Sequence, residues 1–231
     1  MDTEKRLERY RRADSWPTEE ALAAMLDNQQ GAFCAVRQAL PSLAHAVAAA
    51  ADRLRIAAAR LVYVGAGASG RLAVQDGVEL WPTFGWPHER LLYLLAGGEA
   101  ALVVSREGAE DDGVAGGALV EEHGLGAADV VMAVAASGTT AFTRAVVTAA
   151  RRRGSHTIGM ANNPQAPLLA EAEYPILLHT GPEFLAGSTR MTAGTAQKIA
   201  LNLYSTQTMT ALGRVHDGLM VNVVASNRKL V

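Results

Sequence analysis

The sequence lacks several features that would point to particular classes of protein. Its single cysteine, Cys34, cannot form an internal disulfide bond, and we expect a buried or half-buried thiol in a reducing cytoplasm. No apolar run approaches the length of about 18 residues that a membrane span needs. Residues 1–12 are charged and are not followed by the apolar core of a signal peptide. The net charge of −2 gives no argument for nucleic acid or an anionic membrane as a partner.

Metal and hydrolase signatures are also missing. The 6 histidines are scattered without ligand spacing, so we expect no metal site. The absence of a G-x-S-x-G elbow and of a Walker lysine argues against a serine hydrolase and a P-loop protein. Aromatic residues make up 5% of the chain and hydrophobic residues 49%, with much alanine. This composition favours helices packed closely on a sheet.

The chain does contain short apolar runs that alternate with helical segments. We predict strands at 61–64, 91–95, 130–134, 157–160 and 174–179, and helices at 72–80, 113–123, 141–153 and 192–212. This alternation predicts an α/β fold, a three-layer αβα sandwich with a five-stranded parallel sheet. A helical N-terminal arm precedes it, with a long alanine-rich helix that Pro41 could break. We expect Arg53, Arg55 and Arg60 to form a solvated face.

A glycine-rich turn follows the first predicted strand. Gly65, Gly67 and Gly70 lie between this strand and a helix, and Ser69 lies inside the turn. Glycines let the backbone approach a ligand, and the free N–H groups of a helix start favour an anion. A dinucleotide site would need an acidic residue at the end of the second strand. The only nearby acidic residue is Glu99, which comes after two further glycines and is poorly placed for that role. A sugar phosphate, a dinucleotide and a purely structural turn all remain open at this point.

A second polar turn follows the third predicted strand, at Ser137, Gly138, Thr139 and Thr140. The carboxyl ends of parallel strands share one edge of a sheet, so we expect this turn to lie beside the glycine turn. Backbone N–H groups and hydroxyls from both turns would form a phosphate cradle. An ordinary helix cap is the alternative for this second turn.

Carboxylates are available near the expected edge. Glu107 and Glu110 belong to an acidic loop, and Glu79 follows the glycine turn on its helix, where we expect it near the mouth of the same site. Two carboxylates in different environments can divide general-acid and general-base duties. A merely solvated loop is the alternative for Glu107 and Glu110.

These residues resemble the sugar isomerase (SIS) family, and within it the N-acetylmuramic acid 6-phosphate etherases and the related glucokinase regulatory protein. The resemblance covers roughly residue 18 to the end and implies a flavodoxin-like sheet. It implies a division into residues 1–59, a helical arm with dimerisation helices, and residues 60–231, an SIS domain that binds a sugar phosphate. The matching blocks are residues 64–71, 82–85, 96–98, 106–111, 135–138, 181–183, 187–191, 193–198 and a tail between 218 and 230.

The resemblance implies cofactor-free cleavage of the lactyl ether of N-acetylmuramic acid 6-phosphate by a cytoplasmic homodimer. Glu79 matches the glutamate that assists the departure of lactate, and Glu110 matches the base at C2. Both would be catalytic. The residues implied in substrate binding are Gly67, Ala68, Ser69, Glu107, Ser137, Gly138, Thr139, Thr140, Ser188 and Thr189.

Some positions depart from the family pattern. Leu80 and Trp81 follow Glu79 where the family has cysteine and proline, Thr192 stands in place of a lysine, and Arg228 in place of a glutamate. Family members continue past the position of Val231 into a small helical domain. Two other functions therefore stay open, a non-catalytic regulator that senses a sugar phosphate and an aldose–ketose phosphate isomerase.

Overall fold

The computed structural model describes residues 1–224, so Arg228 and the end of the matching tail lie outside the described residues. As predicted, a five-stranded parallel sheet forms its centre. The strands are β1 (Leu61–Gly65), β2 (Leu91–Leu95), β3 (Val130–Val134), β4 (His156–Ala161) and β5 (Tyr174–Leu177), in the order β2-β1-β3-β4-β5. The order reverses between β1 and β3. In open α/β sheets, ligands bind beyond the strand ends at such a point.

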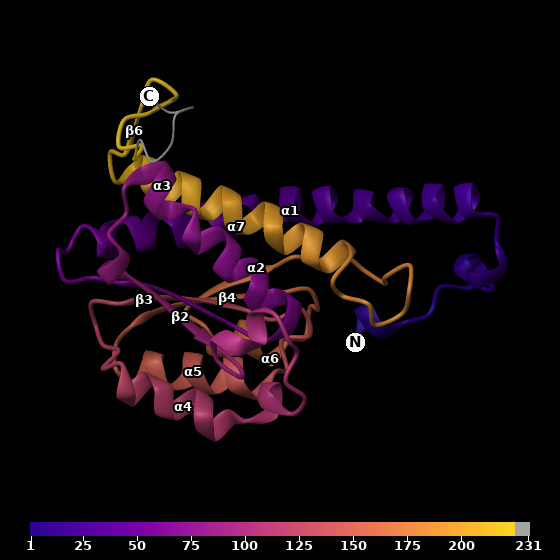
Figure 1. The fold of residues 1–231 in the computed structure, drawn as a ribbon, viewed down its shortest axis with the longest axis horizontal. Coiled ribbons are helices and arrows are strands. Elements are labelled where there is room, and N and C mark those ends of the chain that lie inside the picture. The colour runs from indigo at the N-terminus through magenta and orange to yellow at the C-terminus, as the bar shows by residue number, and fades with distance from the viewer. Residues whose placement is uncertain (225–231) are drawn as a thin grey trace.

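Helices cover both faces of the sheet (Figure 1). One face carries α1 (Thr18–Leu54), α2 (Gly67–Val78) and α7 (Thr192–Ala211), and the other carries α4 (Gly113–Glu122), α5 (Ala141–Arg152) and α6 (Pro167–Glu171). Alternate strand residues therefore enter different cores. Tyr63 and Met132 pack with α1 and α7, whereas Val62 and Val131 pack with α4 and α5. Burial on both faces explains why the strands are continuous apolar runs.

Helix α1 is a single long helix, and the break that Pro41 could have caused does not occur. Pro41 is exposed, and Ala39 and Leu43 on either side of it are buried in the core, which holds the helix together across it. Cys34 is exposed instead of buried or half-buried, because it lies on a side of α1 that does not face the core. The first turns of α1 extend beyond the sheet (Figure 1). Its buried residues begin only at Asn28.

Shorter elements complete the described chain. The N-terminal arm, residues 1–17, contains three 3₁₀ turns, η1 (Asp2–Glu4), η2 (Glu8–Tyr10) and η3 (Ala13–Ser15), in place of a long helix. Helix α3 (Leu80–Phe84) follows α2, and η4 (His88–Arg90) precedes β2. The acidic loop contains η5 (Glu99–Leu102) and η6 (Ala109–Asp111). A hairpin of β6 (Val215–His216) and β7 (Leu219–Met220) follows α7.

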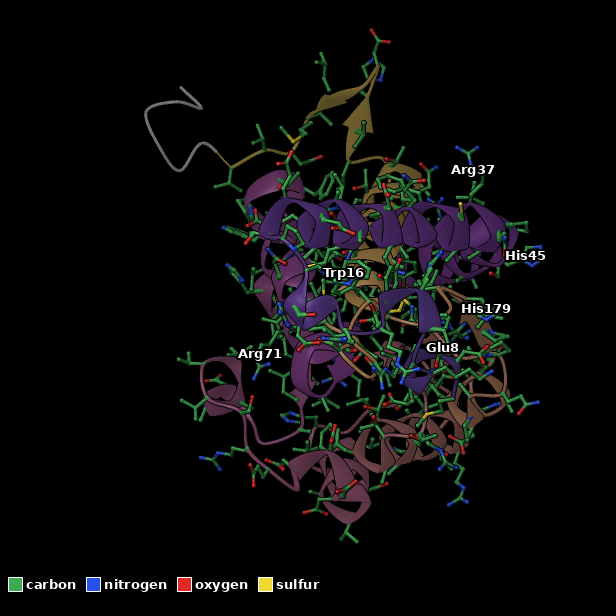
Figure 2. All side chains as sticks on the ribbon, turned by 90° about the vertical axis from the view of Figure 1, so that its right-hand side faces the viewer. Glu8, Trp16, Arg37, His45, Arg71 and His179 are labelled. Atoms are coloured by element: carbon green, nitrogen blue, oxygen red, sulfur yellow. The ribbon has the colours of Figure 1, made fainter. Side chains whose placement is uncertain are left out.

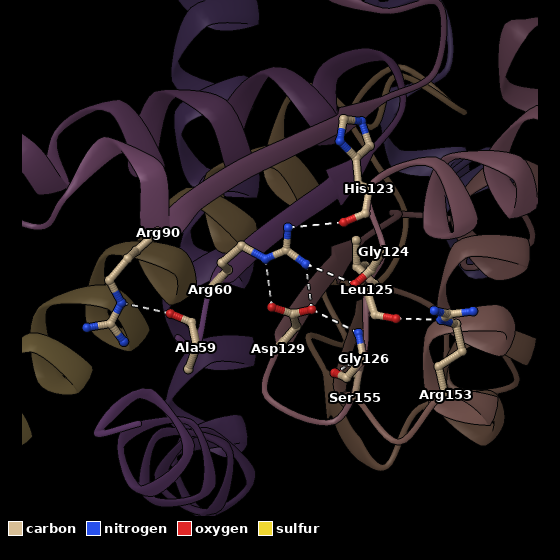
Figure 3. A network of polar contacts seen from close by, with 10 residues as sticks. All are labelled: Ala59, Arg60, Arg90, His123, Gly124, Leu125, Gly126, Asp129, Arg153 and Ser155. Atoms are coloured by element: carbon tan, nitrogen blue, oxygen red, sulfur yellow. Dashed lines mark hydrogen bonds and ion pairs between the residues drawn. The ribbon is translucent and has the colours of Figure 1, made fainter. Parts of the chain in front are cut away.

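Arg60 is not part of a solvated face, contrary to the prediction. Its Nε and Nη2 donate to the two carboxylate oxygens of Asp129 at 2.9 and 2.8 Å, and its Nη1 donates to the carbonyl of His123 (Figure 3). Asp129 is only 3% exposed and also accepts the N–H of Gly126. The hydrogen bonds that Arg60 donates to Asp129 raise the pKa of the Arg60 guanidinium. This pair fastens the start of β1 to the loop before β3.

Replacing Arg60 with alanine is expected to lower the free energy of unfolding by about 2–4 kcal/mol, because Asp129 would be left buried with one charged partner removed. Urea denaturation followed by circular dichroism measures the change. Arg152→Ala, at an exposed arginine of α5, is the control and should change stability by less than about 0.5 kcal/mol. Equal effects of the two substitutions would contradict the assigned role of Arg60.

Candidate functional site

The glycine turn places the start of α2 directly against β1. A Cβ on Gly65 would lie 2.8 Å from the Cα of Gly70, and a Cβ on Gly70 would lie 2.9 Å from the carbonyl carbon of Gly65. Only glycine at both positions allows the helix to start this close to the strand. Helix α2 begins at Gly67, five residues earlier than predicted, and Ser69 is buried in its first turn at 8% exposure. The free N–H groups of α2 therefore lie at the sheet edge.

A cavity of about 230 Å³, which we call the loop cavity, opens beside this turn, and its charged lining residues are two glutamates and two arginines, Arg71 and Arg106. Gly67, Glu107 and Glu110 are among its lining residues, so the structure brings together two predicted carboxylates and the glycine turn. Both glutamates are exposed. Arg71 also lines the cavity. Its Nε donates to the carbonyls of Ala101 and Leu102 at 3.1 Å, and its Nη2 donates to Ser105.

The role of Arg71 was not predicted from the sequence. It fastens the acidic loop to the first turns of α2 and so sets where Glu107 and Glu110 lie. A cation near a helix N-terminus is unfavourable for the helix dipole. An arginine in the first turns of a helix therefore indicates a specific partner, and this signal was present in the sequence.

A second cavity, of about 450 Å³, lies at the hydroxyl turn. Ser137, Thr139 and Asn163 line it, together with Asp2 and Lys5 of the N-terminal arm. The Oγ of Ser137 accepts hydrogen bonds from the N–H and the hydroxyl of Thr139, at 3.1 and 3.0 Å. Gly138 has a φ of +67°, and a Cβ there would lie 2.3 Å from Ala166. Thr140 directly precedes α5, so the turn presents the N-terminus of that helix.

The two turns are neighbours because their strands pair. Gly65 at the end of β1 is in register with Val134 at the end of β3. The glycine turn and the hydroxyl turn therefore leave the same edge of the sheet from adjacent strands, as the sequence predicted. An anion held at one turn can carry a molecule that extends to the other.

The other predicted binding residues line neither cavity. Ala68 and Ser69 lie within the first turn of α2. Ser188 and Thr189 lie in the loop before α7, where the N–H of Gly194 donates to the carbonyl of Thr189 at 2.8 Å. Within one chain, Ser188 and Thr189 therefore share no cavity with the glycine turn or the hydroxyl turn.

The start of α7 contains a buried carboxylate that received no role from the sequence. Glu183 is 0% exposed and accepts the N–H groups of Thr192 and Ala193, at 2.9 and 2.8 Å. It therefore caps the helix. Thr192, which stands where the family has lysine, is also fully buried and donates its hydroxyl to Asn28 at 2.7 Å. The threonine thus ties α7 to α1.

Glu79 lies at the opposite end of α2 from the glycine turn. Ten residues separate it from Ser69, so it is displaced by about 15 Å along the helix axis. The expectation that it lies near the mouth of the same site is therefore not met within one chain, because nearly the whole length of α2 separates it from the glycine turn. Glu79 is exposed beside Val78 and Trp81, whose side chains are 47% and 37% exposed. One protomer by itself does not bring Glu79 and Glu110 together.

Comparison with known proteins places the chain in a family. Residues 42–150 match the glucokinase regulatory protein N-terminal SIS domain, and residues 115–207 match the SIS domain. An N-acetylmuramic acid 6-phosphate etherase of Deinococcus radiodurans is 51% identical over 96% of this chain and 72% of its own length. The chain belongs to the N-acetylmuramic acid 6-phosphate etherase family. A second etherase, from Erwinia tasmaniensis, is 49% identical over 85% of this chain and 64% of its own length.

Solved structures agree with this etherase-family fold. A phosphoheptose isomerase from Francisella tularensis superposes with a TM-score of 0.60 at 15% identity, covering 87% of this chain and all of that chain. This likeness supports the fold alone. In residues 1–224, no helix combines the length and apolar character needed to cross a membrane. The same residues contain no group of three His, Cys, Asp or Glu side chains arranged to hold a metal ion.

Proposed function

We propose that this chain cleaves the lactyl ether of N-acetylmuramic acid 6-phosphate, giving N-acetylglucosamine 6-phosphate and D-lactate, by elimination and hydration without a cofactor. The observation that carries the proposal is the 51% identity to an etherase over 96% of the chain. Two cavities at adjacent strand ends support it, one with hydroxyls and one with carboxylates. Such a pair suits a substrate with a phosphate at one end and an acidic C–H bond at the other.

The proposed placement of the substrate follows from these two cavities. The phosphate lies at the hydroxyl turn, where Ser137, Thr139, Thr140 and the N-terminus of α5 donate hydrogen bonds. The sugar extends toward the glycine turn, and Glu107 binds its hydroxyls. Glu110 then reaches C2 of the open-chain aldehyde from the loop cavity.

The proposed reaction has an elimination half and a hydration half. Glu110 removes the C2 proton, which the adjacent aldehyde makes acidic, and the electron pair forms the C2–C3 double bond. The C3–O bond breaks, and lactate leaves with a proton from Glu79. Water then adds across the double bond, its oxygen to C3 and a proton to C2. One water is consumed in all, and no electrons are gained or lost, so the step needs no redox cofactor.

A second copy of the chain is part of this proposal. Glu79 is exposed at the far end of α2, and a homodimer can bring it from one copy to the Glu110 of the other. Helix α1 offers a surface for this contact. Leu26, Phe33 and Leu40 recur every seven residues on one side of it and are 71%, 66% and 47% exposed. We place the dimer in the cytoplasm, where the exposed Cys34 would stay reduced.

Introducing two charges on the α1 stripe is expected to convert a dimer into a monomer. In the double variant Leu26→Glu/Phe33→Glu, association of two copies would bury two charged carboxylates from each copy, which costs free energy. The mass measured by light scattering should therefore fall to that of one chain, 24.3 kDa. Gln38→Glu is the matched control, because Gln38 is exposed about 140° around the helix from Phe33. A double variant that keeps the mass of two chains would contradict the proposed interface.

Release of lactate tests the proposed function directly. The protein is incubated with N-acetylmuramic acid 6-phosphate, and lactate and N-acetylglucosamine 6-phosphate are quantified. We expect equal amounts of both products, and none from unphosphorylated N-acetylmuramic acid at the same concentration. Binding without lactate would favour a regulator instead. Conversion of a hexose 6-phosphate between its aldose and ketose forms, without lactate, would favour an isomerase.

A further inference from the structure

The N-terminal arm forms one wall of the cavity at the hydroxyl turn. Asp2 and Lys5, far away in sequence, line this cavity opposite Ser137 and Thr139. Figure 2 looks onto the side of the molecule where the arm lies. It shows Glu8 and Trp16 of the arm below α1. The first five residues of the arm thus lie across the proposed phosphate site, and we call residues 1–5 the strap.

The strap is attached by buried contacts. Thr3 is 0% exposed, and its carbonyl accepts the N–H of Gly187 at 3.0 Å. Asn163 accepts the N–H of Asp2 at 2.8 Å, and its own amide donates to the Thr3 hydroxyl and to the carbonyl of Ala136. Ala136 directly precedes Ser137, so one buried side chain links the strap to the hydroxyl turn. This attachment fixes the backbone next to Lys5.

Lys5 has the positively charged side chain of this cavity wall, which Met1 with its α-amino group also lines. Among its lining side chains within residues 1–224, Asp2 and Lys5 are the charged ones. The Nζ of Lys5 lies 2.6 Å from Asp2, with 67% of the Lys5 side chain exposed. The hydrogen bond from Lys5, followed by that from His179, lowers the pKa of the Asp2 carboxyl. Exposed ion pairs of this kind are weak, so Lys5 can leave Asp2 for a stronger partner.

A phosphate at the hydroxyl turn would be such a partner. The turn itself offers hydroxyls, N–H groups and a helix N-terminus, none of which carries a full positive charge. A phosphomonoester carries close to two negative charges at neutral pH. His179, whose Nε2 lies 3.0 Å from Asp2, stays with that carboxylate when Lys5 turns away. The arrangement therefore lets Lys5 exchange one anion for another without leaving Asp2 alone.

We propose that residues 1–5 are a strap that completes the phosphate site and that Lys5 supplies the positive charge that selects phosphorylated sugars. This inference rests on the proposed function for the identity of the sugar. It assigns a specificity residue that lies outside both turns and more than 130 positions away from Ser137 in the chain.

The test measures ligand binding to the full chain by titration calorimetry, with N-acetylglucosamine 6-phosphate and with N-acetylglucosamine. Lys5→Met is expected to weaken binding of the phosphorylated sugar about tenfold to a hundredfold, because one charge-assisted hydrogen bond is lost. Binding of the unphosphorylated sugar should not change. Raising the salt concentration should weaken the parent protein more than the variant, because Lys5 is exposed.

Arg11→Met is the matched control. Arg11 lies on the same arm, pairs with Glu8 three residues away, and has the same 67% exposure as Lys5, but it does not line the cavity. It should bind the phosphorylated sugar within about twofold of the parent protein, and Lys5→Arg should keep most of the affinity. Equal losses in Lys5→Met and Arg11→Met would overturn the inference. So would equal losses for both sugars, or a parent protein that does not bind the phosphorylated sugar.

The outcome is separable from that of the proposed function. If the protein releases lactate and Lys5→Met binds the phosphorylated sugar as well as the parent protein does, the inference about Lys5 is wrong and the proposed etherase activity stands. Phosphate-dependent binding that requires Lys5, without any lactate release, would remove the etherase and leave the strap.

Discussion

Replacing Glu110 with glutamine is expected to lower kcat for lactate release by about a thousandfold, within the range of 10² to 10⁴ for a general base. Glutamine has nearly the same shape and keeps the contacts of the loop, but it cannot take the C2 proton. Glu110 lines the loop cavity with Gly67 and Arg71. The substrate should still bind, because the phosphate contacts lie at the hydroxyl turn, so KM should change far less than kcat.

The adjacent residue gives the control for this prediction. Asp111 is exposed, belongs to the same 3₁₀ turn and does not line the cavity, so Asp111→Asn removes the same charge beside the site. It should keep kcat within about threefold of the parent value. If Asp111→Asn and Glu110→Gln lowered kcat equally, the loss of negative charge in the loop, and not the loss of a positioned base, would explain the result.

Mixing two inactive variants is expected to restore about a quarter of the parent activity if the active site is shared between copies. Glu79→Ala and Glu110→Ala should each be nearly inactive alone. In a random mixture about half of the dimers contain one chain of each kind. Each of these has one site with both glutamates intact and one site with neither. We expect a site shared between copies because Glu79 is displaced by about 15 Å along α2 from the glycine turn of its own chain.

Activity of the mixture is compared with the sum of the separate variants after the chains have been unfolded and refolded together. A mixture of Glu110→Ala with Glu110→Gln is the control, because neither chain can supply the missing base. No gain in the Glu79→Ala and Glu110→Ala mixture would mean that the two carboxylates do not meet across an interface. The proposed role of Glu79 would then fail, since one copy alone does not bring it to Glu110.

The sequence predicted the layers of this fold well, because burial on both faces makes each strand a continuous apolar run. The edge of the sheet was also predictable, since adjacent parallel strands must deliver their polar turns to the same place. Gly67, Ser137 and Glu110 were accordingly found at that edge. The start of α2 was less predictable. Its first turn contains small residues without an apolar period, so the helix was predicted to begin at Leu72.

Glu79 lies near the C-terminal end of both the predicted and the observed helix. Its distance from the glycine turn followed from the helical rise of about 1.5 Å per residue, and the expectation that it lies at the mouth of the site did not take that rise into account. Contacts distant in sequence were hidden. The pairing of Arg60 with Asp129 and the docking of Thr3 beside Asn163 depend on the finished fold. No local pattern marks either one.

One missed element did carry a local signal. Asp217 and Gly218 join β6 and β7 with φ values of +48° and +74°, as a type I′ turn requires. Asp-Gly between two short segments is a strong hairpin signal, although the residues around it show no clear apolar period.

Running the reaction in heavy water enriched in oxygen-18 tests the central claim most directly. If Glu110 removes the C2 proton and water adds to the resulting double bond, N-acetylglucosamine 6-phosphate will contain deuterium at C2 and oxygen-18 at C3. The lactate will keep its ordinary ether oxygen. A product with hydrogen retained at C2, or lactate that contains oxygen-18, would contradict elimination and show that the ether is broken by direct displacement.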